Sequence, residues 1–188
     1  MIITGSIITA IVVLLVISLI LFYNSMVRGR NMVEEAWSGI SVQLKRRHDL
    51  VPVLVNSVKG YMTHEQETLT RIAELRASAV SASSSGSVQA IAHAENQLMG
   101  ALRSLFAVSE NYPDLRANEN FMQLQEQRSR LEDEIQLSRR YYNGTARDQN
   151  NRVLQFPGNL VARSFGFARV EYFELADPAE AEAPEVKF

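Results

Sequence analysis

The feature that most constrains this chain is an apolar run near its amino terminus, from Ile2 to Phe22. No charged side chain occurs between Met1 and Val27. As an α-helix rising 1.5 Å per residue, the run spans roughly 30 Å, which matches the hydrocarbon core of a bilayer. About a dozen Leu, Ile and Val side chains each favour insertion by roughly 0.3 to 0.6 kcal/mol. The run therefore predicts a transmembrane helix, with Tyr23 at the headgroup boundary.

Two other interpretations of the run fit less well. A cleaved secretory signal has a basic start, a shorter apolar centre and a cleavage site with small residues. The first six residues here carry no Lys or Arg, and the run ends in Leu21-Phe22-Tyr23-Asn24 without an Ala-x-Ala pattern. A buried core helix of a soluble protein would offer a polar face, and this run has none. We expect a retained single-pass anchor.

The basic residues that flank the run predict its orientation. Only the amino terminus precedes the run, whereas Arg28, Arg30 and Lys45-Arg46-Arg47 follow it. Lys and Arg near a membrane span favour the cytoplasmic side, and acidic residues count for little in this rule. The bias predicts an amino terminus outside and the bulk of the chain in the cytoplasm.

Composition narrows the class of the remaining chain. The chain has 188 residues, a net charge of −2 and no cysteine. Near-neutral charge indicates neither a nucleic-acid partner nor an acidic substrate. Absence of cysteine excludes disulfides, thiolate metal sites and thiol catalysis. The frequent Ala, Leu, Gln, Glu and Arg predict one all-α domain after the anchor.

A heptad pattern follows the anchor, with apolar residues at alternating steps of four and three. It predicts one rod that continues the anchor helix, with a packing seam that only Arg47 interrupts. Pro52 lacks an amide donor and its ring clashes with the His48 carbonyl, so we expect a kink or a short break there. A register that crosses Pro52 favours the kink. The seam positions are Val33, Trp37, Ile40, Leu44, Arg47, Val51, Leu54, Val58 and Tyr61.

Three further helices are predicted, at about 64–80, at about 88–111 and from about residue 118. Thr63 with Gln66 predicts a capping box for the first of them, and Ser87 can cap the second. The helix from residue 118 carries Glu and Arg at four-residue spacing, which is typical of a solvated face. Asn143-Gly144 predicts a break in that helix, and 156–159 is expected to end the regular structure. The predicted organisation is an anchor (1–27), a helical bundle (28–155), an aromatic segment (156–175) and a disordered acidic tail (176–188).

Several motifs along the chain are distinctive. They are Tyr23-Asn24, Arg30-Asn31-x-Val33-x-Glu35-Ala36-Trp37-Ser38-Gly39-Ile40, Val42-Gln43-Leu44-Lys45-Arg46-Arg47-His48-Asp49-Leu50-Val51-Pro52, Gly60-Tyr61-x-x-His64-Glu65, Tyr112-Pro113-Asp114-Leu115, Arg140-Tyr141-Tyr142-Asn143, Phe156-Pro157, and Phe165-Gly166-Phe167 with Tyr172-Phe173. Through these motifs the chain resembles the LemA family. The resemblance implies an amino-terminal transmembrane helix that continues into an antiparallel bundle of three to four long helices in the bacterial cytoplasmic membrane. It implies no established enzymatic activity, and some relatives are associated with membrane compartments. Val53 and Gln149 depart from the family pattern, where Asn and an aromatic residue are usual.

Side chains able to do chemistry are few, and we predict no catalytic, cofactor or metal site. His48-Asp49 could orient a base, but adjacent residues on a helix point about 100° apart. We expect them to cap backbone groups freed by Pro52. His64-Glu65 begins a helix with no second histidine at the spacing of a metal site, so capping is favoured. Lys45-Arg46-Arg47 is expected to be solvated or to contact another subunit.

The aromatic segment near the carboxyl end is the most informative part of the chain for binding. Phe165, Phe167, Tyr172 and Phe173 lie outside any clear amphipathic helix. We predict that they contact the membrane or a partner, and the alternative is that they fold back to cap the bundle. The seam residues Trp37, Leu44, Leu54 and Tyr61 are expected to pack in the core.

These observations favour a non-enzymatic, membrane-anchored oligomeric scaffold that organises or shapes the bacterial membrane. The expected partners are the lipid bilayer and further copies of the chain, with a membrane-protein partner also open and no nucleic acid. The alternative is a regulatory adaptor that binds a partner membrane protein or enzyme. An enzyme ranks third, and would need a pocket lined by His48, Asp49 or His64.

Overall fold

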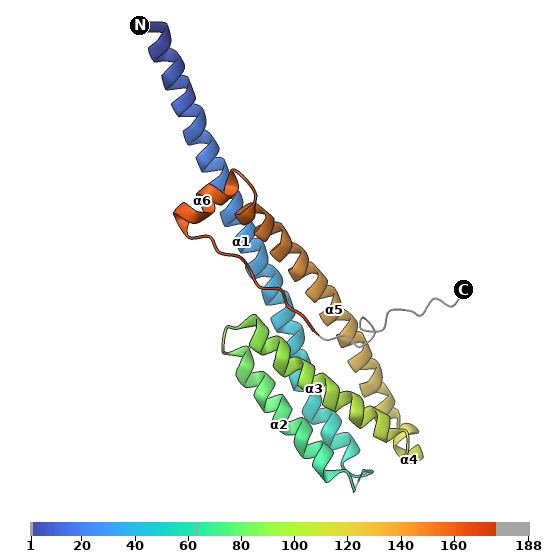
Figure 1. Ribbon diagram of the computed structural model, residues 1–188. Helices are drawn as coiled ribbons and strands as arrows, with labels where there is room; N and C mark the ends of the chain where they lie inside the picture. The colour runs from blue at the N-terminus through green and yellow to red at the C-terminus, as the bar shows by residue number, and fades with distance from the viewer. Residues whose placement is uncertain (1, 63, 176–188) are drawn as a thin grey trace, which may run out of the picture. The chain divides into compact units, whose positions relative to one another are not determined.

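The computed structural model describes residues 2–62 and 64–175, and every regular element among them is a helix (Figure 1). The long amino-terminal apolar helix packs against later long helices, so the predicted all-α bundle is confirmed. The capping role predicted for Thr63 and the tail predicted to be disordered at 176–188 lie outside the described residues. The helices are α1 (Ile2–Val58), α2 (Gln66–Ser83), α3 (Val88–Ser109), α4 (Pro113–Arg116), α5 (Glu119–Leu154) and α6 (Gly158–Phe165).

The contacts divide the chain into two compact units, and both long helices contribute to each of them. The first unit combines α1 up to Ser38 with Arg140–Glu171, which holds the end of α5 and all of α6. The second unit combines Gly39–Arg139 with the chain from Tyr172.

In the first unit, α1 and α5 pack closely at an aromatic pair and at a glycine. The Trp37 and Tyr142 rings lie 5.3 Å apart. At Gly29, a Cβ atom would overlap the side chains of Gln149 and Arg152, so the glycine allows close approach. The chain after α6 is held against α5 by Asn150, whose side chain donates to the Val170 carbonyl at 3.0 Å and accepts its amide at 2.7 Å.

The second unit has its own apolar core. The antiparallel pair α2 and α3 packs with the carboxyl part of α1 and the start of α5, and α4 closes the end. Ser87 caps α3 as predicted, accepting a hydrogen bond from the Ala90 amide at 3.2 Å. The most buried apolar residues are Ile72, Ala79, Val58, Met62, Leu98, Leu105, Leu115 and Phe121.

Helix α1 passes through Pro52 without a break. The carbonyl of His48, which Pro52 cannot bond, accepts a hydrogen bond from Arg76 Nε on α2 at 2.6 Å. The prediction that the side chains of His48 and Asp49 compensate for the proline is wrong, because an arginine from the neighbouring helix does so. The helix ends at Val58, so the heptad pattern does not reach Tyr61, and Met62 is the buried residue there.

Two predicted boundaries are wrong. Helix α5 continues through Asn143-Gly144, because Tyr142, Thr145 and Ala146 are buried around the glycine. That packing outweighs the helix penalty of about 1 kcal/mol for glycine. Regular structure also does not end at 156–159: α6 begins at Gly158 and buries Val161 and Ala162.

Candidate functional site

The first unit places a compact aromatic and apolar cluster where the apolar run of α1 ends. The large apolar side chains from Ile7 to Leu21 are exposed, whereas Phe22 is half-buried and Met26 is fully buried. Met26 packs against Val153 of α5 and against Val161 and Ala162 of α6. Protein packing therefore begins where the length of the run predicts the hydrocarbon core to end.

Tyr23 anchors the carboxyl-terminal aromatics to this boundary. Its ring lies 5.0 Å from the ring of Phe165 and 5.7 Å from that of Phe167, both in edge-on geometry. Such pairs contribute about 0.5–1.5 kcal/mol each beyond the burial of their area. The Arg30 guanidinium lies 6.0 Å from the centre of the Phe167 ring. The predicted contact residues Phe165 and Phe167 thus form one cluster with the first residue after the run.

The other two predicted contact residues belong to the second unit. Phe173 is fully buried, and Tyr172 is exposed. The four aromatics therefore do not form one exposed surface. Phe165 exposes about half of its surface and Tyr172 about a third, whereas Phe167 is half-buried. Burial of Phe173 matches the alternative in which the segment folds back on the bundle.

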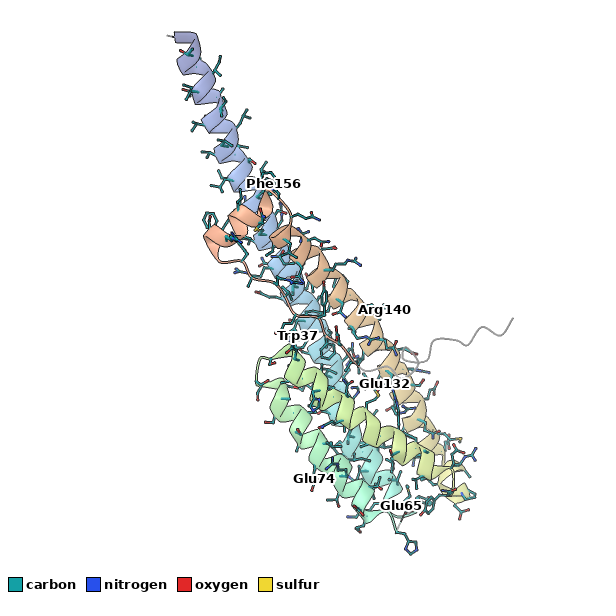
Figure 2. All side chains as sticks on the ribbon, in the orientation of Figure 1. Trp37, Glu65, Glu74, Glu132, Arg140 and Phe156 are labelled. Carbon is teal, nitrogen blue, oxygen red and sulfur yellow. The ribbon has the colours of Figure 1, made fainter. Side chains whose placement is uncertain are left out.

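Most of the exposed apolar surface of this region comes from residues that sequence reasoning did not select, and Phe165 is the one member that it did select. We call it the juxtamembrane patch, and Phe156, with 79% of its surface exposed, is its most prominent member. Figure 2 shows Phe156 at the end of α5, next to the exposed part of α1. A cavity of about 130 Å³ lies beside Phe156 and is also lined by Ser25 and Arg152. The patch consists of Leu154, Phe156, Leu160 and Phe165.

One weak sequence signal could have revealed α6. Gly166 has a positive φ of 74° and ends the helix in the left-handed conformation, as a C-terminal glycine commonly does. Arg163 lies in the last turn, where a cation suits the helix dipole. Eight residues are too few for helical periodicity to be distinctive, so the helix was missed.

The second unit buries a charged cluster around Arg47. The Arg47 side chain is 2% exposed and donates to Glu95 Oε2 at 2.7 Å and to Glu132 Oε2 at 2.5 Å. Glu95 is fully buried and also accepts from His48 Nε2 at 2.6 Å. The prediction that Arg47 is solvated or contacts another subunit is therefore wrong. Arg46 next to it is exposed and pairs with Glu134 at 3.2 Å.

The predicted solvated face of α5 is correct only in part. Arg130 and Glu126 form an exposed pair at 2.5 Å, as four-residue spacing predicts. Arg128 instead lies 4.4 Å from the centre of the Phe106 ring, and Glu132 turns to Arg47 (Figure 2). Two of the expected surface charges are thus committed to contacts between helices.

The three histidines do not form one site. His48 contacts Glu95 in the core, His93 Nε2 lies 3.3 Å from Gln97 Nε2, and His64 is exposed. Among residues 2–62 and 64–175, no three His, Asp or Glu side chains are grouped as metal ligands. The absence of enzymatic activity stays a prediction.

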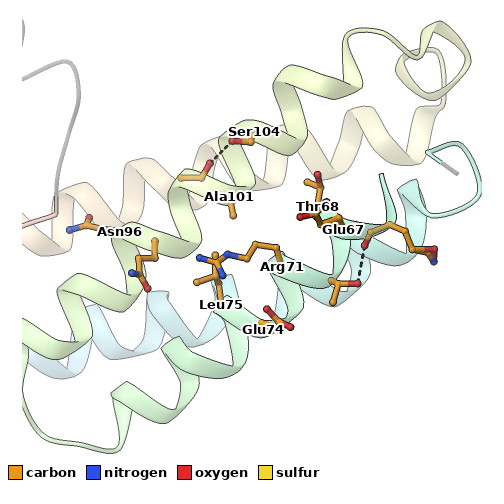
Figure 3. Close-up of a pocket in the computed structure, with 12 residues that line it drawn as sticks. Glu67, Thr68, Arg71, Glu74, Leu75, Asn96, Ala101 and Ser104 are labelled. Atoms are coloured by element: carbon orange, nitrogen blue, oxygen red, sulfur yellow. Dashed lines mark hydrogen bonds between the residues drawn. The ribbon is translucent and has the colours of Figure 1, made fainter. Parts of the chain in front are cut away.

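A polar groove of about 920 Å³ lies on the outer side of α2 and α3. Figure 3 shows Arg71 and Glu74 of α2 on one wall and Asn96, Ala101 and Ser104 of α3 on the other. Ser104 and Thr70 donate to carbonyls within their own helices, so their hydroxyls support the helices rather than a ligand. The residues that line the groove bring no nucleophile and base together.

The predicted seam residues are placed differently from one another. Leu44 and Leu54 are buried, at 3% exposure each. Trp37 is half-buried against Tyr142. Tyr61 lies beyond the helix and is exposed, and its hydroxyl accepts from Asn118 Nδ2 at 3.1 Å.

These features define a class of protein: a helical bundle whose first helix carries a candidate membrane span. One N-terminal helix among the described residues is long and apolar enough to cross a bilayer, which suggests membrane anchoring. The model of the LemA family matches residues 36–188. The chain belongs to the LemA family.

Curated relatives agree with this assignment. Protein LemA of Metamycoplasma hominis is 30% identical over 156 residues, covering 82% of this chain and 69% of the relative. Magnetosome protein MamQ 2 of Paramagnetospirillum magneticum is 24% identical over 186 residues, covering 87% of this chain and 68% of the relative. Magnetosome protein MamQ of Magnetospirillum gryphiswaldense is 23% identical over 179 residues, covering 83% and 66%.

Proposed function

We propose that this protein is a non-enzymatic, membrane-anchored scaffold that assembles with further copies of itself to organise or shape the bacterial cytoplasmic membrane. The observation that carries the proposal is that α1 runs from Ile2 to Val58 without a linker between the apolar run and the packed bundle. A simple tether needs no such continuity, because a flexible linker would serve it equally well. A scaffold needs this continuity, because a rigid connection couples the position of the folded bundle to the position of the anchor in the bilayer.

The distant relatives support a role in membranes. Three of them are named magnetosome proteins, and they align with more than four-fifths of this chain. A shared fold does not transfer a function, but the aligned region includes the packed helices. We infer that the common element is a membrane-anchored bundle that organises a membrane surface.

The distribution of charge supports a cytoplasmic bundle. Two segments of the first unit, residues 22–33 and 150–169, contain no Asp or Glu. Folding brings the second segment next to the first, which increases the basic character of the membrane-proximal side beyond what Arg28 and Arg30 provide. The five arginines of these segments are Arg28, Arg30, Arg152, Arg163 and Arg169.

The topology is tested with fusions to the carboxyl terminus. A fused alkaline phosphatase is expected to be inactive, because that enzyme needs an oxidising compartment to form its disulfides. A fused green fluorescent protein serves as the matched control and is expected to be bright. Strong phosphatase activity would contradict the cytoplasmic assignment.

The scaffold itself is tested by electron cryotomography of cells that overproduce the full chain. We expect clustered protein and altered membrane curvature or extra membrane. The control is a variant in which Leu14 and Ile17 of the span become Arg, which prevents insertion because a central Arg costs about 2.5–3.5 kcal/mol. Unaltered membranes with the intact chain would contradict the proposal.

The regulatory adaptor is the second candidate, and the groove between α2 and α3 favours it. The groove has charged walls, with Arg71 and Glu74, and is large enough for side chains of a partner. An adaptor predicts a crosslinked partner of a different mass in constant stoichiometry, without large self-assembly. Glu74→Lys should then abolish that crosslink, whereas a scaffold that does not use the groove would keep its assembly.

A further inference from the structure

We propose that the loop and helix from Leu154 to Phe165 form a second membrane contact, which lies in the interface of an anionic phospholipid bilayer beside the anchor. The inference rests on the membrane anchoring in the proposed function. It adds that the protein is held at two places, by the span of α1 and by the juxtamembrane patch, rather than by the span alone.

The first argument is the position of α6. Its inner residues Val161 and Ala162 pack on Met26, four residues beyond the end of the apolar run. Four residues of α-helix correspond to about 6 Å. Interfacial helices bury their apolar face roughly 5–10 Å into the boundary between headgroups and acyl chains. The fold therefore holds α6 within about 6 Å of the end of the apolar run, close enough for exposed apolar side chains to reach this boundary.

The second argument is that the outward residues of this region are apolar and exposed in the folded chain. Phe156 is 79% exposed and Leu160 is 57% exposed, although both lie beside a buried core. Leu154 and Phe165 are each exposed by about half. Phe165 also contacts Tyr23, the aromatic residue next to the span. Aromatic rings are enriched at this level of a membrane.

The third argument is charge. The patch is surrounded by arginines, and the segments that carry it contain no acidic residue. Arg163 is exposed on α6, and Arg152 lines the cavity beside Phe156. Such a combination of apolar side chains with flanking cations complements a bilayer with anionic headgroups. A symmetric contact with a second copy would place this same acid-free, arginine-bearing face against itself, so we assign the patch to lipid.

The absence of cysteine makes the test direct, because each introduced cysteine carries the only spin label. The full chain is reconstituted into vesicles of phosphatidylcholine with a quarter of phosphatidylglycerol. Labels are placed by Phe156→Cys and Leu160→Cys, and the collision rates of each label with oxygen and with a water-soluble nickel complex are compared. Oxygen concentrates in lipid and the nickel complex in water.

The matched control is Tyr141→Cys, on α5 in the same unit. Tyr141 is 52% exposed, close to the value for Leu160, but lies 13 residues before Leu154. That separation corresponds to about 20 Å of helix. Leu14→Cys, in the middle of the span, reports whether the anchor itself is inserted.

We expect an oxygen-to-nickel ratio several-fold higher at positions 156 and 160 than at position 141, and a high ratio at position 14. In vesicles of phosphatidylcholine alone, the ratio at position 160 should fall, since the arginines lose their anionic partners. An unchanged ratio would overturn the assignment to anionic lipid. Ratios at 156 and 160 equal to that at 141, or labels shielded from both reagents, would overturn the second contact. In those cases, a high ratio at position 14 would show that the anchor is still inserted and that only the second contact is wrong. A low ratio at position 14 would contradict the membrane anchoring itself.

Discussion

Replacement of Glu95 by Gln should destabilise the bundle strongly, although it changes almost no volume. Glu95 has no exposed surface and accepts hydrogen bonds from Arg47 at 2.7 Å and from His48 at 2.6 Å. The substitution removes the negative charge but leaves Arg47 buried. Glu132 is then the remaining counter-charge, and its side chain is 18% exposed. Loss of one partner of a buried ion pair costs about 3–5 kcal/mol where the other charge stays uncompensated. Because Glu132 still pairs with Arg47, we expect the lower end of this range, about 3 kcal/mol.

The magnitude translates into a clear thermal shift. For a chain of this size, 1 kcal/mol corresponds to roughly 2–4 °C in the midpoint of unfolding. Glu95→Gln should therefore lower the midpoint by about 6–12 °C, measured by far-ultraviolet circular dichroism on the full chain in detergent micelles.

The neighbouring arginine supplies a matched control. Arg46 and Glu134 also join α1 to α5, at 3.2 Å, but their side chains are 61% and 51% exposed. An exposed pair contributes about 0–1 kcal/mol. Glu134→Gln should consequently move the midpoint by no more than about 4 °C. Equal shifts for the two variants would refute the reasoning, because the buried carboxylate should contribute far more than the exposed one.

A double variant separates charge from packing. Arg47→Met combined with Glu95→Leu replaces the two most buried charges by apolar side chains, and leaves Glu132, whose side chain is 18% exposed, as the remaining charge. Replacement of a buried pair by apolar residues is often neutral or stabilising. The double variant should therefore be more stable than Glu95→Gln, and a loss equal to the sum of the single variants would argue against direct coupling.

Two further predictions concern the first unit. In Gly158→Ala, the new Cβ would lie 2.5 Å from the Arg152 carbonyl oxygen, so α6 should loosen and trypsin should cleave faster after Arg163. The control Gly144→Ala, whose new Cβ meets nothing within 4 Å, should be neutral or slightly stabilising. Equal cleavage rates in the two variants would contradict the packing. Burial, and then the charge of Glu171, raise the pKa of Tyr142, so the folded state keeps this proton longer than the unfolded state. The contribution of Tyr142 to stability should thus be complete below the ordinary pKa of about 10 and fall as the pH rises through the raised value. Tyr142→Phe should lose the hydrogen bond to the Glu171 carbonyl but should not show this alkaline loss in thermal unfolding. Parallel pH profiles of the two proteins would contradict the assignment.

Local sequence patterns made most of the helical architecture predictable. The apolar run, the heptad spacing and the cap at Ser87 depend on local chemistry, and each corresponds to an observed feature of α1 or α3. The break predicted at Gly144 failed because local propensity is weaker than packing, and buried Tyr142 and Ala146 hold the helix. Helix α6 was missed because eight residues show too little periodicity.

The polar contacts were less predictable, since they join residues far apart in the chain. Arg47 was recognised as an interruption of an apolar seam, but its partners are 48 and 85 residues away. Glu95 gave a usable signal: it lies between Ile91 and Leu98 on the apolar face of its helix. Two opposite charges on the inner faces of neighbouring helices predict a buried pair, and that rule would have found this one.

The central claim is that copies of this chain assemble through a membrane-anchored bundle, and the mass of the native particle tests it most directly. Membranes containing the untagged chain at its natural level are solubilised into lipid discs with an amphipathic copolymer, and the number of copies per disc is counted by native mass spectrometry. The account predicts several copies of the 21.1 kDa chain in each disc. Discs that hold a single copy, alone or with one different partner, would contradict it.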